Sequence, residues 1–100
     1  VEFNGFLTEG YELAPGSDAE ALLATVHESV MQTALPEITS LAYLDARVFA
    51  LYADTSCLVY GPHSDNIHGF NERVSIESIR RITKTLALFT ANWCGLESIS

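Results

Sequence analysis

The sequence predicts an α/β fold, specifically a fragment of a mostly parallel β-sheet flanked by helices. Segments with strand-like and helix-like patterns alternate along the 100 residues. Residues 57–60 form a continuous apolar run between turn residues, as is typical of a strand covered on both faces of a parallel sheet. Hydrophobic residues make up 48% of the chain and charged residues 18%, so we expect a packed globular chain rather than a disordered one.

The first part of the chain predicts a strand followed by a helix. Residues 1–14 alternate loosely between apolar and polar side chains and are expected to form a strand, which Pro15 and Gly16 end. Ser17 and Glu20 then have the spacing of a capping box, in which each satisfies a backbone N–H of the other. The helix that begins there is expected to end before Pro36.

One face of this first helix is apolar and is expected to pack inward. Its members are Ala19, Leu22, Leu23, Val26 and Val30. His27 lies near the same face, and we interpret it as a packed or rim histidine rather than a ligand.

The second part of the chain predicts two further strands and two further helices. Residues 37–43 read as a short strand, and Asp45 stands at the N-cap of a helix over 46–52. After the strand at 57–60 and a polar loop, Ser75 is expected to cap the last helix and Gly95 to end it. The apolar stripe of that helix is interpreted as core packing; it consists of Ile79, Ile82, Leu86, Phe89 and Trp93.

Composition narrows the classes of partner. The net charge is −8 and no basic stripe is present, so a nucleic-acid partner is not expected. No apolar segment reaches the roughly 18 residues of a membrane-spanning helix. The two cysteines do not make a disulfide framework, so we expect two buried thiols in a reducing compartment, the cytoplasm.

The start of the chain and the thinness of the sheet suggest that the chain is a piece of a longer protein. It does not begin with Met and opens inside a strand-like pattern. About three strands make a thin sheet, and an apolar sheet of this kind needs neighbours. Uncovered strand edges and apolar surface also favour self-association, so we expect a homo-oligomer.

The loop over 61–73 carries the densest group of potential ligands. His63, Asp65, His68 and Glu72 lie within ten residues, immediately after a predicted buried strand. One interpretation is a self-contained metal site formed by these four side chains. The alternative is a hydrogen-bonded structural loop, since Asp65 and Asn66 are also ordinary turn formers.

A second loop is predicted to open on the same edge of the sheet. Ligands of open α/β sheets bind at the carboxyl ends of the strands, and Arg47 follows one such end while His68 follows another. A guanidinium beside a metal suits a substrate with a carboxylate, which Arg can bind through two hydrogen bonds. Arg47 could equally pair with Asp54 or Glu72, and Asp45 could act only as a helix cap.

The loop resembles the C-terminal signature of the M20 family of metallopeptidases and amidohydrolases, which includes the acetylornithine deacetylase and succinyl-diaminopimelate desuccinylase group. The matching segments are Tyr60-Gly61-Pro62, Asn66-Ile67-His68 with Glu72 four residues later, Val74-Ser75, and Asp45-Ala46-Arg47 upstream. The resemblance covers essentially the whole chain. It implies that residues 1–14 form a strand leaving the lid or dimerisation domain. Residues 15–100 would be the C-terminal portion of a zinc-exopeptidase-like catalytic domain.

The resemblance also implies roles for individual residues. His68 would be a metal ligand, and Glu72 and Asp45 would support the site from behind the groups that touch metal or substrate. The substrate would be met by three further residues, namely Arg47, Ser64 and Asn66. Leu44 departs from the Thr or Ser found in many members, so a substrate hydrogen bond from that position is not expected.

The function implied is that of a metal-dependent amidohydrolase, which cleaves N-acyl amino acids or small peptides by metal-activated water. Zinc is the expected ion, with cobalt or manganese as alternatives. A hydrolytic zinc site needs at least three protein ligands, and the remaining ligands and the general base would lie upstream. No catalytic residue is therefore expected within these residues, and the isolated chain should be inactive. The rival interpretation is a non-enzymatic α/β module.

Overall fold

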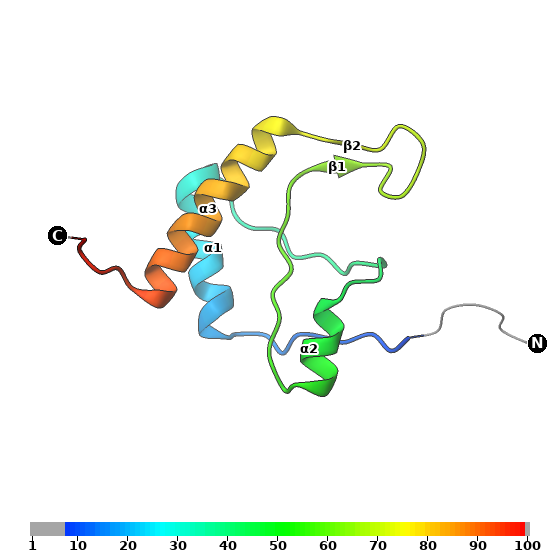
Figure 1. Ribbon diagram of the computed structural model, residues 1–100, viewed down its shortest axis with the longest axis horizontal. Coiled ribbons are helices and arrows are strands. Elements are labelled where there is room, and N and C mark those ends of the chain that lie inside the picture. The colour runs from blue at the N-terminus through cyan, green and yellow to red at the C-terminus, as the bar shows by residue number, and fades with distance from the viewer. Residues whose placement is uncertain (1–7, 100) are drawn as a thin grey trace, which may run out of the picture.

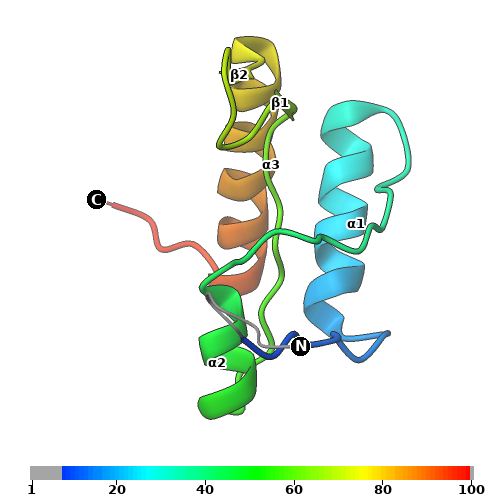
Figure 2. The ribbon, with the colours of Figure 1, turned by 90° about the vertical axis from the view of Figure 1, so that its right-hand side faces the viewer.

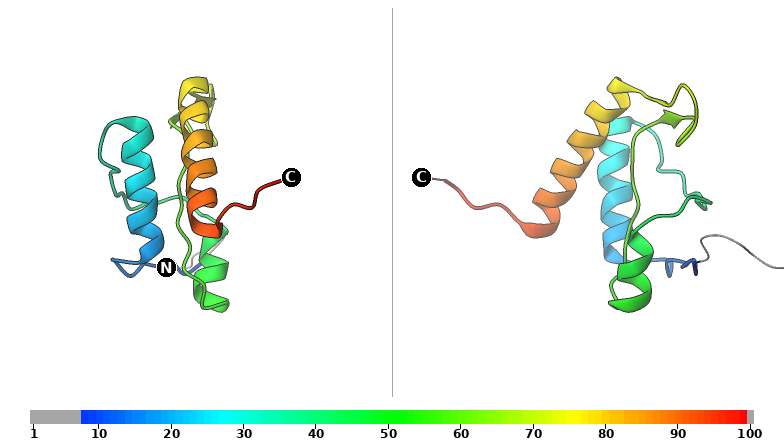
Figure 3. Two further views of the ribbon diagram at one scale, coloured as in Figure 1. Left: turned by 90° about the vertical axis from the view of Figure 1, so that its left-hand side faces the viewer. Right: turned by 45° about the vertical axis from the view of Figure 1, so that its right-hand side comes forward.

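Two antiparallel helices and a short hairpin define the structure, which is a computed structural model describing residues 8–99. The order of elements is α1 (Asp18–Met31), α2 (Ala46–Tyr52), β1 (Ser64–Asp65), β2 (Arg73–Val74) and α3 (Ile76–Cys94). Helices α1 and α3 lie side by side in all views, with α2 at one end of the molecule and the hairpin at the other (Figures 1, 2 and 3).

Helix α1 begins where the capping box predicts. The Glu20 backbone N–H donates to Ser17 Oγ at 3.2 Å, and the Ser17 backbone N–H donates to Glu20 Oε2 at 2.9 Å. The helix ends at Met31, followed by Gln32 in the left-handed conformation, with φ 60°. Both the start at Ser17 and the end ahead of Pro36 are therefore confirmed.

The core lies between α1 and α3. Leu23 and Val26 are its buried apolar residues among those described, while Thr85 of α3 is completely buried. Thr85 satisfies its hydroxyl by donating to the Arg81 carbonyl oxygen at 3.0 Å, so it can occupy the contact without an unpaired polar group. A contact built around a residue this small allows the two helices to approach closely.

His27 is packed, as expected. The residue is 8% exposed, and its Nδ1 lies 2.7 Å from the Tyr60 hydroxyl, with the two rings edge to face. This hydrogen bond attaches residues 57–63, the segment that leads to β1, to α1.

The prediction that the apolar stripe of α3 is core is only partly right. Ile82 and Phe89 are half-buried, but Ile79, Leu86 and Trp93 are 39%, 43% and 55% exposed. The reason is that α1 covers one narrow face of α3, and no sheet among the described residues covers the adjacent face. The expectation of two buried thiols is also only partly right. Cys57 is half-buried and Cys94 is exposed, and both are free.

The only sheet among the described residues is the two-stranded antiparallel hairpin, in which Ser64 pairs with Val74 and Asp65 with Arg73. It lies in the segment predicted as loop. Residues 8–14, 37–43 and 57–60 carry no regular secondary structure, and the rest of the strand predicted over 1–14 lies outside the described residues. A strand requires a hydrogen-bonded neighbour, so the parallel sheet, which needs strands beyond these residues, stays a prediction.

The capping box makes α1 sensitive to acid. Hydrogen bonds from the Ser17 backbone and side chain lower the pKa of Glu20 below its ordinary value near 4.5. The stabilisation is therefore present above pH 4.5 and is lost as the pH falls through the lower pKa of the folded state.

We expect the Glu20→Gln variant to lose less stability than the wild type as the pH falls below about 4.5, because Gln can keep the cap without titrating. Denaturant unfolding at a series of pH values measures this. Glu12→Gln is the control, because Glu12 is exposed and has no hydrogen bond among the described residues. Identical pH profiles for Glu20→Gln and wild type would contradict the expectation.

Candidate functional site

The hairpin is fixed to the start of α3 through the backbone of His63. The Ser75 N–H donates to the His63 carbonyl oxygen at 2.9 Å, and the His63 N–H donates to Ser78 Oγ at 3.0 Å. Ser75 is also the N-cap of α3, since its hydroxyl accepts from the Ser78 N–H. The loop is thus anchored to a 19-residue helix by the same residues that begin that helix.

The loop between β1 and β2 bends through three left-handed residues. Asn66, His68 and Asn71 have φ of 54°, 62° and 57°. Asn tolerates this region better than most residues, and His is also enriched there, so the sequence suits the shape. The Asn66 carbonyl oxygen accepts from the Gly69 N–H at 2.7 Å, which closes the first turn.

His68 is exposed at this turn, and Glu72 contacts its backbone. The His68 N–H donates to Glu72 Oε1 at 3.3 Å, so Glu72 joins the two sides of the loop. Sequence reasoning expected Glu72 to support the loop, and this bond is consistent with that expectation. The imidazole of His68 has no hydrogen-bond partner within the described part of the chain.

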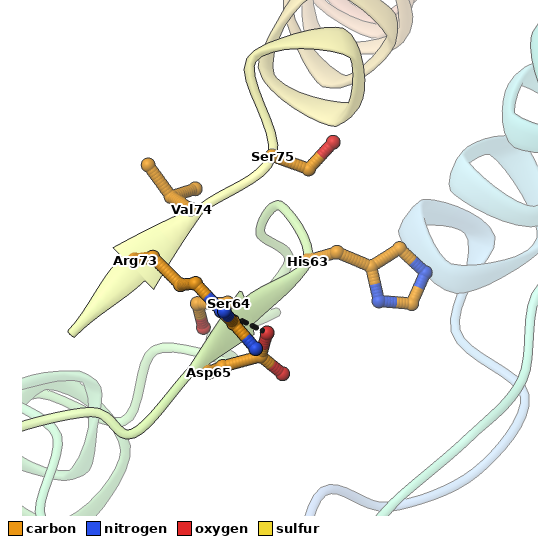
Figure 4. Close-up of a pocket in the computed structure, with 6 residues that line it drawn as sticks. All are labelled: His63, Ser64, Asp65, Arg73, Val74 and Ser75. Carbon is orange, nitrogen blue, oxygen red and sulfur yellow. Dashed lines mark hydrogen bonds and ion pairs between the residues drawn. The ribbon is translucent and has the colours of Figure 1, made fainter. Parts of the chain in front are cut away.

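A shallow hollow of about 270 Å³ lies on the hairpin beside the N-terminus of α3. Its lining is formed by His63, Ser64, Asp65, Arg73, Val74 and Ser75 (Figure 4). Arg73 Nε donates to Asp65 Oδ2 at 2.9 Å, and Figure 4 shows the His63 ring pointing away from this pair. Both side chains are well exposed, so the pair contributes at most about 1 kcal/mol.

The four potential ligands of the loop do not converge. No group of three or more His, Cys, Asp or Glu side chains that could hold a metal occurs among residues 8–99. Asp65 is paired with Arg73, and Glu72 is bound to the loop backbone. The arrangement gives no support to a self-contained metal site, whereas one exposed histidine is compatible with donating a single ligand to a site completed by other residues.

Arg47 lies in the first turn of α2, away from the hairpin. Figures 1 and 2 place α2 and the hairpin at opposite ends of the molecule, so the described residues do not bring Arg47 beside His68. Their expected meeting at one sheet edge depends on the parallel sheet, which stays a prediction.

Asp45 occupies the N-cap position of α2 but makes no capping hydrogen bond. Its φ of −65° and ψ of −18° are helical rather than extended, and this conformation does not turn the carboxylate back onto the backbone. The sequence therefore predicted the position of Asp45 correctly, but the capping hydrogen bond expected from an N-cap Asp is absent.

Arg47 is held by Tyr43 rather than by an acid. Its Cζ lies 5.1 Å from the ring centroid of Tyr43, and neither Asp54 nor Glu72 forms an ion pair with it. A side-chain hydrogen bond with Tyr43 raises the pKa of the Arg47 guanidinium, with a smaller contribution from Tyr52. Sequence reasoning missed this contact, because Tyr43 precedes α2 and the spacing rule for side-chain pairs on a helix does not apply to it.

Comparison with known proteins shows that the chain is similar to part of a deformylase. The chain is 30% identical over 96 residues to N-formyl-4-amino-5-aminomethyl-2-methylpyrimidine deformylase of Bacillus subtilis (strain 168). The match covers 95% of this chain and 22% of that protein, so the chain spans about a fifth of its length. No family model matches the chain. No described helix is long and apolar enough to cross a membrane.

We expect Glu72→Ala to loosen the loop around His68, because the His68 N–H loses its acceptor. Amide exchange at His68 should become about two- to tenfold faster, as expected for one exposed hydrogen bond. NMR-detected hydrogen exchange measures this. Glu97→Ala, an exposed acid outside the loop, is the control and should leave the rate unchanged. Equal rates in Glu72→Ala and wild type would contradict this role for Glu72.

Proposed function

We propose that the chain is the C-terminal part of an M20-type metal-dependent amidohydrolase. The observation that carries the proposal is the similarity to a deformylase along 95% of the chain. The Asn66-Ile67-His68 segment with Glu72 adds support, because it presents an exposed histidine on a loop anchored to α3. The full enzyme removes an acyl group from an amine, and the metal, when bound, activates water and polarises the scissile carbonyl.

Residues of this chain bind and orient in the proposed reaction. His68 would be one ligand of the metal, and Glu72 would hold the loop that carries His68. We propose that the metal is zinc, with cobalt or manganese as alternatives. Asp45 supports the site from behind the groups that touch metal or substrate. The substrate is contacted by Arg47, Ser64 and Asn66. The further ligands and the general base come from polypeptide outside these residues.

The surroundings of the enzyme are part of the same proposal. Two free cysteines support a reducing compartment, the cytoplasm. The exposed apolar side chains of α3 support burial in a larger assembly, and we propose a homo-oligomer. A net charge of −8 argues against a nucleic-acid partner.

In the full-length enzyme, His68→Ala should lower kcat by more than roughly 100-fold, because the variant removes a metal ligand. Loss of a residue that only hydrogen bonds to a ligand typically costs up to about 100-fold. Bound zinc, measured by elemental analysis, should fall in parallel. The matched control is His63→Ala, since His63 acts on the loop through its backbone and should retain metal and activity.

A different outcome would favour the self-contained loop site. Equal loss of zinc binding in His63→Ala and His68→Ala, seen in the 100-residue chain alone, would contradict the proposal. Unchanged metal content in full-length His68→Ala would remove its physical basis.

The substrate has two candidate classes. Arg47 favours an N-acyl amino acid, whose carboxylate a guanidinium binds through two hydrogen bonds. The relative favours a second candidate, because its name describes removal of a formyl group from an aminomethylpyrimidine. The two classes differ in whether the substrate carries a carboxylate.

We expect Arg47→Ala to lower kcat/KM for an N-formyl amino acid by about 10- to 100-fold, the range of one charged hydrogen-bonded contact, and to spare the formylated pyrimidine. Steady-state kinetics with both compounds measure this. Activity toward the pyrimidine alone, in the wild type, would assign the second candidate.

A further inference from the structure

The Arg47 guanidinium is held by an aromatic ring that precedes α2. Tyr43 precedes the helix and lies under the guanidinium, with Cζ 5.1 Å from its ring centroid. Tyr52, the last residue of α2, makes only a minor contribution to raising the pKa of this guanidinium. The arginine in the first turn of this seven-residue helix is therefore held by an aromatic side chain that precedes the helix.

The same arrangement leaves one polar atom unsatisfied. Arg47 Nε is buried and has no hydrogen-bond partner in the described part of the chain. Covering an N–H donor without an acceptor is unfavourable for folding, and native structures contain few such groups. Stability alone therefore does not explain why this guanidinium is covered on its Nε side rather than left in solvent.

Orientation does explain it. A free arginine side chain has many rotamers, and binding a planar two-oxygen group requires the guanidinium to hold one plane. A ring that lies against the guanidinium face sets that plane. Less conformational entropy is then lost when a ligand binds.

We propose that Tyr43 is a positioning residue, which holds the Arg47 guanidinium in the orientation that receives the carboxylate of an N-acyl amino acid. The inference rests on the proposed function for the role of Arg47 itself. Tyr43 acts through Arg47, so the expected effect is on binding of the carboxylate rather than on the hydrolytic step.

The kinetic test compares an N-formyl amino acid with its carboxamide in the full-length enzyme. Tyr43→Leu should raise KM for the carboxylate by about tenfold, the scale of a lost cation–π contact, with kcat changed less than about twofold. Tyr43→Phe keeps the ring and should recover most of this loss. KM for the carboxamide should not change. The control is Leu41→Ala, because Leu41 is fully exposed two residues before Tyr43.

The outcomes separate this inference from the proposed function. A rise in KM for both substrates alike, or no recovery in Tyr43→Phe, overturns the positioning role. If Arg47→Ala leaves carboxylate discrimination unchanged, the carboxylate-binding role of the proposed function fails instead.

A measurement without substrate tests the positioning itself. In the wild type, the Arg47 Nε–H should exchange slowly with solvent, because the atom is buried. Exchange should become faster in Tyr43→Leu and stay slow in Tyr43→Phe, as followed by NMR of the arginine side chain. Unchanged exchange in Tyr43→Leu overturns the inference whichever substrate the enzyme uses.

Discussion

The packing of α1 against α3 is the contact on which the rest of the structure depends. It buries Leu23 and Val26 from one helix and Thr85 from the other. The hydrogen bond between His27 and Tyr60 adds the segment that leads to the hairpin. The hairpin then joins α3 through His63. Individual hydrogen bonds, rather than a broad apolar contact, therefore connect the core to the exposed loop. A few residues are enough to fix the position of the loop.

Local signals predicted local structure well. The capping box of Ser17 and Glu20 predicted the start of α1, and Ser75 and Gly95 predicted the start and the end of α3. Such caps are decided by side chains within one turn of the helix boundary. His27 was correctly interpreted as packed. The caps need no information about the distant chain, whereas His27 was interpreted from its place near the apolar face of α1 and its partner Tyr60 lies far along the sequence.

Features that depend on a neighbour could not be predicted in the same way. Residues 57–60 have a strand's composition, but a strand exists only with a partner, and no described residue pairs with them. The apolar stripe of α3 was identified correctly as a stripe, yet which of its residues are buried depends on what lies opposite. For the site, the sequence indicated that His68 and Glu72 share a loop, and their contact is present. It did not indicate that Tyr43 holds Arg47, because cation–π contacts have no strong composition signal.

The exposed line of Ile79, Leu86 and Trp93 has a geometric consequence for whatever covers it. The three residues are spaced at intervals of seven, while a straight α-helix returns to the same face slightly later than that. The line therefore rotates by about 20° per interval, or about 40° from Ile79 to Trp93. Neighbouring strands of a sheet turn relative to one another by a similar angle, about 20–25°. A flat surface would touch only part of this line, and full coverage requires a surface that twists with the helix.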